Sequence, residues 1–520
     1  MNRDARPEGS HATMPELSGL LRAGLWISTL TIASKGLGLI REGVLAWAFG
    51  TSGLADAFRV SQTGVFLLIH LLAGSVLDSA FLPTFKHMLS GGHPRLAWLT
   101  VRLSGRVLAV AGILLCVLLW LFAPVWVGLL APGFDEPRRE LTVQLLRAMA
   151  LTVPLGLLVN LSITVATGLY RFRVPPLRVV IQNGSILLGI VLTISVGSVM
   201  FLGMALPFAQ AVMLLLLIPV IRPLARASVR GTAARRGVAW RHLRVAMAPG
   251  LALVALEQAA VLVERIVASR LPEGSIASLD YARFLVETPM VTIGLGMAQV
   301  MLPALADLSA GRDRERLDRS ARAYLIGALW GVFPIAIWLF VCGEDLVRIL
   351  YQRGAFDEQS VRTTTEALFG FTLGLWAWFG GTVVLQKLLY AQRRLRPLIP
   401  LTAVSLGTFL IAAWTLAATE GVRGVALAFS LSQIVYFAGA LVIQGRTFAR
   451  AALLPLLHVL GGALALGWAL RFLPELSPIA HAALGLLCVV LGWILWTLPS
   501  REMRGLADTL FRRLFARARS

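Results

Sequence analysis

The chain has 520 residues, of which 57% are hydrophobic and 14% are charged. Because an ordinary soluble domain carries about a quarter charged residues, this composition excludes a soluble globular protein and predicts a membrane protein. The formal net charge of +21 would suggest nucleic-acid binding in a soluble chain, but here the arginines lie in the connections between apolar segments, so no nucleic-acid partner is expected.

Residues 1–24 are polar and lack the apolar core of a cleavable signal peptide, so we expect them to form a cytoplasmic segment. Six apolar segments follow, each close to the ~20 residues that a helix needs to cross a bilayer. Their apolar runs are continuous rather than alternating, which favours helices over a closed barrel. The six predicted spans, which together form an N-lobe over 25–221, are 25–49, 59–83, 104–130, 142–170, 178–196 and 200–221.

A basic linker, 222–244, is expected in the cytoplasm and leads to six further spans, which form a C-lobe over 245–444. A final pair of spans lies within 453–498, and the basic, helix-periodic tail, 499–520, is expected on the anionic inner membrane surface. The sequence thus predicts an all-α polytopic membrane protein with fourteen transmembrane helices. The last eight are 245–269, 282–306, 323–345, 367–391, 398–418, 422–444, 453–471 and 479–498.

Lys and Arg residues favour one side of the predicted membrane. The connections on the same side as the two termini carry several times more of them than the opposite connections. Cytoplasmic loops are enriched in Lys and Arg, so both termini are expected in the cytoplasm and the number of spans is expected to be even.

The two six-span blocks resemble each other. GTSGLADAFRV (50–60) is similar to EGSIASLDYARFL (273–285), and AFLPTF (80–85) corresponds to VMLPAL (300–305), at nearly the same offset along the chain. Because six is an even number, the two copies share one orientation and form a parallel repeat about an axis along the membrane normal. Two such lobes facing each other predict a cavity between them.

Ionisable side chains gather on the first two spans of each repeat. Such residues cost about 2.5–3.5 kcal/mol each at the centre of a membrane helix on insertion scales, so their placement is informative. This concentration predicts that four helices line a shared aqueous cavity. The candidates within spans are Lys35, Arg41, Glu42, Arg59, His70, Asp78, Glu257, Glu264, Arg265, Arg283, Glu287 and Lys387.

Helical spacing groups these candidates. Lys35 and Glu42 are seven residues apart, as are Glu257 and Glu264, so each pair lies along one helix face. Arg283 and Glu287 are four apart and can pair directly.

A second interpretation of the charged residues stays open. They can be buried ion pairs that fix helix packing, or long side chains that reach the membrane interface. This interpretation is favoured for Arg59, near a span end, and a hydrogen-bonded packing role fits His70 as well as a functional one.

Arg and Lys side chains bind phosphate through charge-assisted hydrogen bonds, so a cationic cavity in a membrane favours an anionic headgroup as ligand. The carboxylates would orient the cations, or take up protons or a coupling ion. No Walker loop, nucleophile elbow or metal-binding spacing is present, so we expect neither an enzyme nor a cofactor. Cys116, Cys342 and Cys488 lie singly in apolar runs and are expected to be structural, with no metal site.

Several motifs together resemble one family. SKGLGLIREGVLAWAFGTSGLADAF (34–58) is similar to the opening signature of the MurJ (MviN) family of lipid II flippases. Further matches follow in order along the chain: AFLPTF (80–85), LLAPGFD (129–135), LPEGSIASLDYA (271–282) and LYQRGAFDEQS (350–360). The family belongs to the multidrug/oligosaccharidyl-lipid/polysaccharide exporter superfamily. The resemblance implies two six-helix lobes, alternating access, and a groove for a polyprenyl tail formed with the last two helices.

The resemblance also implies site residues in the first span and the loop after it. Ser34, Lys35, Arg41, Glu42 and Asp56 occupy the family's polar signature. Lys35 stands where arginine is usual, which keeps the charge but loses the bidentate fork.

Two departures from the family pattern affect other spans. Glu287 matches a family glutamate, but Arg283 lies one position before the family arginine, whose place Phe284 takes. In the second span, Ile69 and His70 replace an arginine pair and Gly74 replaces a glutamate. The cavity therefore keeps its character with fewer fixed cations.

The implied function is translocation of an undecaprenyl-diphosphate-linked saccharide, with lipid II as first choice, across a bacterial plasma membrane. A paralogue serving an exopolysaccharide or O-antigen repeat unit is the alternative that the altered second span suggests. A small-cation exporter and a membrane scaffold are two further classes. In the interpretation as a flippase of an undecaprenyl-diphosphate-linked saccharide, Lys35, Arg41 and Arg283 hold the diphosphate. The expected roles of the others are orientation or gating for Glu42, Glu287 and Asp56, and contact with the sugar or peptide for His70 and Asp78.

Overall fold

A computed structural model describes most of the chain, with side chains described from residue 33. The described residues are 17–74, 77, 81–171, 173–226, 252–290, 305, 314–392, 394, 396–472, 474 and 476–497. The predicted linker 222–244 lies largely outside these ranges, and the tail 499–520 lies wholly outside them.

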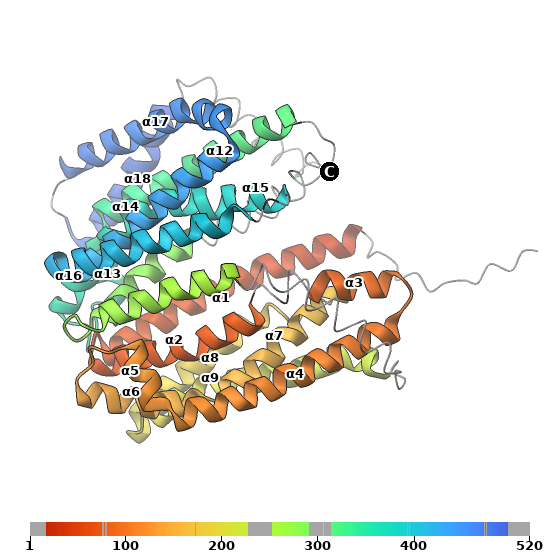
Figure 1. Ribbon diagram of the computed structural model, residues 1–520. Helices are drawn as coiled ribbons and strands as arrows, with labels where there is room; N and C mark the ends of the chain where they lie inside the picture. The colour runs from red at the N-terminus through yellow and green to blue at the C-terminus, as the bar shows by residue number, and fades with distance from the viewer. Residues whose placement is uncertain are drawn as a thin grey trace, which may run out of the picture.

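The N-lobe is a bundle of helices that occupies one side of the molecule (Figure 1). Its first helix begins at Leu17, eight residues before the predicted start, because the helical pattern continues into the polar segment. The helices are α1 (Leu17–Phe49), α2 (Gly53–Ala73), α3 (Leu82–Ser90), α4 (Pro94–Leu121), α5 (Ala123–Leu130), α6 (Glu136–Met149), α7 (Thr152–Gly168), α8 (Leu177–Val196) and α9 (Met200–Arg226).

The C-lobe lies on the other side of the molecule and begins with two helices at 252–268 and 275–290 (Figure 1). The elements that follow are α12 (Arg314–Val341), α13 (Gly343–Tyr351), α14 (Glu358–Trp378), a π-helical segment (Phe379–Leu385), α15 (Gln386–Ala391) and α16 (Leu398–Gln444). The last two long helices are α17 (Arg446–Ala469) and α18 (Pro478–Thr497), which pack against each other and against α12.

Three predicted spans are interrupted in the structure. The second ends at Gly74, where an added Cβ would lie 2.5 Å from the His70 carbonyl oxygen. The third breaks between α4 and α5, where Pro124, the second residue of α5, has no backbone N–H with which to continue α4. The fourth divides into α6 and α7 with a 45° bend, because Pro154 in the first turn of α7 cannot bond to the carbonyl of Ala150.

The predicted spans 398–418 and 422–444 meet within α16. Gly421 has φ 55° and ψ −130°, so the backbone turns there and two helices result rather than one. A residue with a Cβ is strained at this φ, which is why glycine occupies the turn.

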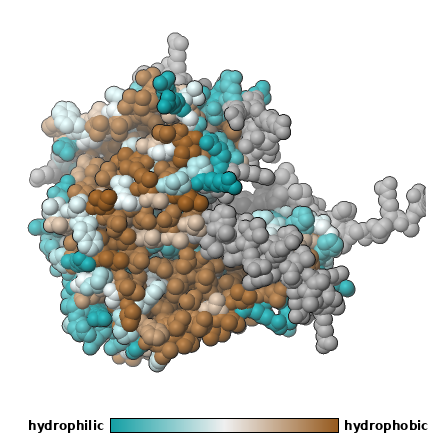
Figure 2. Space-filling view, in the orientation of Figure 1, coloured by the Kyte–Doolittle hydropathy of each residue, from teal (hydrophilic) through white to brown (hydrophobic). Residues whose placement is uncertain are grey.

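A broad apolar surface runs across both lobes, with polar residues toward the ends of the helices (Figure 2). Exposed apolar side chains include Val110 and Leu114 of α4, Ile411 and Trp414 of α16, and Leu454 of α17. An exposed apolar belt of this extent is what a bilayer requires.

Eight of the described helices are long and apolar enough to cross a membrane, and the bent pair α6 and α7 would make a ninth. The prediction of an all-α polytopic membrane protein is confirmed, whereas the count of fourteen stays a prediction. Helices α1, α2, 252–268 and 275–290 are not among the eight.

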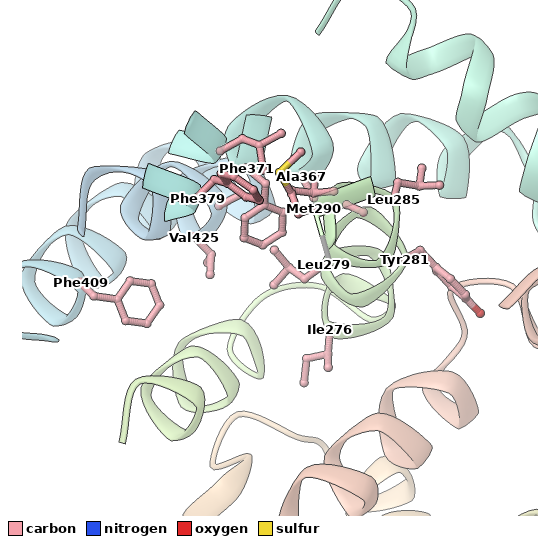
Figure 3. Packing of buried hydrophobic residues seen from close by; sticks show 14 of the residues in the cluster. Ile276, Leu279, Tyr281, Leu285, Met290, Ala367, Phe371, Phe379, Phe409 and Val425 are labelled. Carbon is pink, nitrogen blue, oxygen red and sulfur yellow. The ribbon is translucent and has the colours of Figure 1, made fainter. Parts of the chain in front are cut away.

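The C-lobe core forms around the helix 275–290 (Figure 3). Leu285 and Met290 of this helix are buried in the same cluster as Ala367 and Phe371 of α14. Tyr281, on the same helix, instead points toward the N-lobe, where its hydroxyl donates a hydrogen bond to the Gly50 carbonyl oxygen at 3.1 Å. One face of this helix therefore holds the C-lobe together and another contacts the N-lobe.

Candidate functional site

Charged side chains from both lobes meet between four helices: α1, α2, 252–268 and 275–290. These are the first two helices of each predicted repeat. Their ion pairs form one set, which we call the interlobe network. Its members are Arg41, Glu42, Arg59, Glu264, Arg265, Asp280 and Arg283.

Glu42 of α1 is the N-lobe centre of the network. Its buried carboxylate pairs with the guanidinium groups of Arg41 and Arg59, and Arg59 Nη1 donates to Glu42 Oε1 at 3.3 Å. The Arg59 guanidinium also stands over the Tyr281 ring, 5.3 Å from its centroid. Because a buried charge needs a partner of opposite sign, Glu42 fixes both arginines in place.

Asp280 of the helix 275–290 connects the two lobes. One of its oxygens lies 3.6 Å from Arg59 Nε, and Arg265 Nη2 donates to both oxygens at 2.7 and 3.0 Å. Arg265 also reaches across to α2, where its Nε donates to Thr63 Oγ1 at 3.0 Å. The network therefore crosses the lobe boundary in both directions.

Arg283 is the most exposed cation of the network. It forms an ion pair with Glu264, and its guanidinium stacks on Phe371 and Phe429 with centroid distances of 4.8 and 5.0 Å. The sequence spacing allowed Arg283 to pair with Glu287, but the structure pairs Arg283 with Glu264, on the neighbouring helix. The Arg283 side chain is 24% exposed, whereas the Arg59 side chain is 7% exposed.

The remaining candidates in α1 surround the network. Arg41 Nη1 donates to Asn183 Oδ1 of α8 at 3.1 Å, and Asn183 Nδ2 donates to the Ser34 carbonyl oxygen at 3.3 Å. Lys35, half-buried, interacts electrostatically with Glu287 of the opposite lobe. Lys35 therefore faces the C-lobe, whereas the contacts of Arg41 are with Asn183 and Glu42 of its own lobe.

A cavity of about 260 Å³ opens beside Arg283 within the C-lobe. Glu257 and Glu264 line it along one face of 252–268, together with Gln386 of α15 and Tyr436 of α16. Lys387 is not among the lining residues, and its ammonium stands over Tyr390, 5.3 Å from the ring centroid. The predicted face shared by Glu257 and Glu264 is therefore confirmed.

The lobes are joined at one end by reciprocal helix caps, which we call the closed end. Asp56 of α2 accepts hydrogen bonds from the backbone N–H groups of Gly274 and Ala277 at 2.7 and 2.8 Å, so it caps the helix 275–290. In return, Glu273 accepts from the backbone N–H of Gly53, at the start of α2. Carboxylates at helix N-termini satisfy free N–H groups and favour the helix dipole.

Two glycines permit this contact. Gly274 has φ 85°, and a Cβ there would lie 2.0 Å from the Thr51 carbonyl oxygen. Gly50 has φ 55°, and its Cβ would lie 2.2 Å from the Ala355 carbonyl oxygen. Both positions need a positive φ and a close backbone approach, which only glycine provides.

His70, a candidate of the second span, lies apart from the network. His70 is exposed in the last turn of α2 and stacks on Phe66 with 5.9 Å between ring centroids. Asp78 falls outside the described residues.

Sequence reasoning undervalued two residues of the network and missed a third. The sequence favours a packing role near a span end for Arg59 and gives Arg265 no specific role, yet both are buried in the network. Asp280 was not a candidate at all, although it occupies the same place in the second copy of the repeat as Asp56 in the first. Comparing the copies position by position could have found it.

A family model described as lipid II flippase MurJ matches residues 45–497. A probable lipid II flippase MurJ of Thermotoga maritima is 24% identical over 424 residues, covering 80% of this chain and 84% of that protein. A lipid II flippase MurJ of Burkholderia cenocepacia is 27% identical over 389 residues, covering 68% of this chain and 70% of that protein.

Solved structures share the fold. A lipid II flippase MurJ in an inward closed conformation superposes with a TM-score of 0.77 at 19% identity, covering 95% of this chain and all of that chain. A multidrug resistance MATE family transporter in an inward-facing conformation gives 0.67 at 14% identity, covering 82% of this chain and 98% of that chain. Since the family model spans most of the sequence, this multi-pass membrane protein belongs to the lipid II flippase MurJ family.

Proposed function

We propose that the protein moves lipid II, an undecaprenyl-diphosphate-linked peptidoglycan precursor, from the inner to the outer leaflet of the bacterial plasma membrane by alternating access. The observation that carries the proposal is the interlobe network, which places cations of both lobes together inside a member of this family. A membrane-embedded cluster of this kind suits a lipid with an anionic headgroup.

The exposure of the arginines divides their roles. Arg59 and Arg265 are 7% and 8% exposed and are tied to carboxylates, which suits a structural link between the lobes. Arg41 and Arg283 are 15% and 24% exposed, which leaves them accessible to a ligand. We infer that these two, with Lys35, hold the diphosphate, while Glu42, Glu264 and Glu287 orient them.

The closed end fits one state of an alternating-access cycle. Hydrogen bonds from Asp56 and Glu273 hold the lobes together there, so cargo release at that end requires these caps to break. The distribution of Lys and Arg supports both termini in the cytoplasm, which assigns the closed end to the outer face of the membrane.

The remaining expectations belong to the same proposal. The two lobes over 25–221 and 245–444 move against each other, and the helices within 453–498 add the groove for the polyprenyl tail. Glu257 and Glu264, on the wall of the C-lobe cavity, can take up a proton or a cation that couples transport to an ion gradient. His70 and Asp78 remain proposed contacts of the sugar or peptide, and Lys387 remains a proposed contact on the C-lobe side.

Complementation tests the proposal directly. The gene is expressed in bacteria depleted of their own lipid II flippase, with growth and the accumulation of lipid-linked precursor as readouts. We expect rescue by the natural sequence and none by Arg41→Ala at equal abundance, because Glu42 keeps Arg59 as its partner in that variant.

The matched control is Arg319→Ala, which removes an arginine that is 68% exposed and far from the network in sequence. It should rescue fully. Failure of the natural sequence at normal abundance contradicts lipid II as cargo, and mass spectrometry of the lipid that co-purifies would then test for another polyprenyl-linked saccharide. Full activity of Arg41→Ala would contradict the binding site.

A further inference from the structure

A group of potential metal ligands lies far from the interlobe network, where α18 meets the junction of α12 and α13. Within the described residues, Cys342, Asp345 and His481 bring their ligand atoms within 4.8 Å of one another. They come from three places in the sequence: the residue after α12, the first turn of α13 and the first turn of α18. The residue spacing alone gave no metal motif, since His481 is more than a hundred residues from the other two.

Of the three side chains, one is fully buried and two are partly exposed. Cys342 is fully buried, whereas the side chains of Asp345 and His481 are 20% and 21% exposed. His481 Nδ1 lies 2.6 Å from Asp345 Oδ2, and Cys342 Sγ donates to the His481 carbonyl oxygen at 3.8 Å. The exposed fractions leave room for a water molecule as a fourth ligand.

The surroundings hold these elements in register. Trp338 of α12 donates through Nε1 to the Ala482 carbonyl oxygen at 2.9 Å, one residue beyond His481. About three turns of helix α18 further on, Trp493 Nε1 donates to the Trp330 carbonyl oxygen at 2.9 Å. The backbone that carries the three side chains is therefore fixed by contacts that do not involve them.

The donor set selects a class of ion. A thiol, an imidazole and a carboxylate together suit Zn²⁺ and related divalent transition metals, whereas Ca²⁺ and Mg²⁺ prefer six or more oxygen ligands. Three protein ligands and one open position match the tetrahedral coordination that Zn²⁺ adopts with water as the fourth ligand.

We propose that Cys342, Asp345 and His481 bind one divalent transition-metal ion, with Zn²⁺ as the best fit, and that this ion ties α18 to the C-lobe. The ion enters between His481 Nδ1 and the Asp345 carboxylate and replaces their hydrogen bond. The Cys342 thiol releases its proton to solvent as the metal–sulfur bond forms, so the metal changes no oxidation state.

The pair formed by His481 and Asp345 needs only a small movement. Two ligands at about 2.0–2.1 Å from a tetrahedral Zn²⁺ are ~3.3 Å apart, so His481 Nδ1 and Asp345 Oδ2 must separate by less than 1 Å. Both residues lie in first turns of helices at the partly exposed edge of the group, where side chains have room to shift. A metal there would replace the contact between His481 and Asp345 as the link from α13 to α18, beside the tryptophan hydrogen bonds that join α12 to α18.

Cobalt substitution tests the site in the full-length purified protein. After treatment with a chelator, the protein is titrated with Co²⁺ alone, which reports thiolate coordination by a near-ultraviolet charge-transfer band and tetrahedral geometry by strong visible bands. We expect one Co²⁺ per chain, displacement by Zn²⁺, and a higher thermal unfolding midpoint with Zn²⁺ than with chelator.

Variants separate this site from unspecific binding. Cys342→Ser should remove the charge-transfer band, and His481→Ala and Asp345→Asn should remove the stabilisation by Zn²⁺. Cys116→Ser and His458→Ala are matched controls on α4 and α17 and should change neither readout.

The proposal is overturned if the natural protein shows no thiolate band, or if the band persists in Cys342→Ser. It is also overturned if Zn²⁺ stabilises the natural protein and Asp345→Asn equally. Because none of these measurements involves transport, they stand or fall independently of the proposed flippase activity.

Discussion

The charged helix pairs of the two lobes occupy corresponding places in the repeat, yet their charges differ. In the N-lobe pair, α1 and α2, the network has two cations, Arg41 and Arg59, and one carboxylate, Glu42. In the C-lobe pair, 252–268 and 275–290, it has two of each: Glu264 and Asp280 with Arg265 and Arg283. Two further carboxylates of the C-lobe pair, Glu257 and Glu287, lie outside the network.

This difference shows how two similar lobes can bind each other. Identical copies would place like charges opposite one another, which is costly in a membrane. Complementary copies instead pair Arg59 with Asp280 across the boundary and leave the more exposed cations for a ligand. The closed end keeps a more symmetric arrangement, since each lobe there caps a helix of the other with a carboxylate.

Removal of Arg59, the central cation of the network, should have the largest effect of these variants. Arg59→Ala leaves the buried Glu42 with Arg41 alone and removes the link to Asp280, and breaking a buried ion pair costs about 3–5 kcal/mol. We expect a large fall in abundance and in the thermal unfolding midpoint. Arg41→Ala is the comparison variant and should keep normal abundance, so equal losses in both would refute the division into structural and ligand-binding arginines.

A side chain at Gly274 should open the closed end. Gly274→Val combines an unfavourable positive φ, about 1–2 kcal/mol, with a clash against Thr51. Ser275 is buried in the natural protein. In the Gly274→Val background, we expect the cysteine introduced by Ser275→Cys to react faster with a membrane-impermeant thiol reagent than in the natural background.

The control for this variant is Gly197→Val. Gly197 also has a positive φ, 75°, but nothing lies within 4 Å of its added Cβ. It carries the backbone strain without the contact between lobes, so the reactivity of Ser275→Cys should stay unchanged. Equal labelling in both backgrounds would show that strain alone, rather than lobe contact, governs access.

A conservative change at Arg283 should have the smallest effect of these variants. Arg283→Lys keeps the charge beside Glu264 but loses the contacts of the guanidinium with the Phe371 and Phe429 rings, a contribution of about 0.5–2 kcal/mol. We expect transport to fall several-fold with abundance unchanged, measured as precursor accumulation at matched expression. Activity equal to that of the natural protein would mean that charge alone is needed at this position.

Much of the fold followed from the sequence because a membrane leaves few choices. Continuous apolar runs of about 20 residues must form helices in lipid, and where the structure describes the predicted spans they lie on helices, some of them broken. Breaks within spans were missed where they depend on single residues, as at Gly74 and Pro154, because a hydropathy average does not register one glycine or proline.

The site was predicted less completely. Lys35, Arg41, Glu42 and Arg283 could be found because a charge inside an apolar run stands out. The pairing could not be predicted, since a residue such as Asp280 lies in a polar connection, where only a comparison of the two copies marks it, and gains its role only when the lobes meet.

The sequence by itself determined that the chain crosses a membrane as helices, that it contains a repeat, and which helices carry charge. These properties are set by hydropathy and by periodicity along one chain segment. Only the tertiary structure decided which charges pair, because Arg59 and Asp280, like Cys342 and His481, are distant in sequence and meet through the packing of separate helices. Ion pairs and metal sites depend on distances of a few ångströms, which no pattern along a single helix specifies.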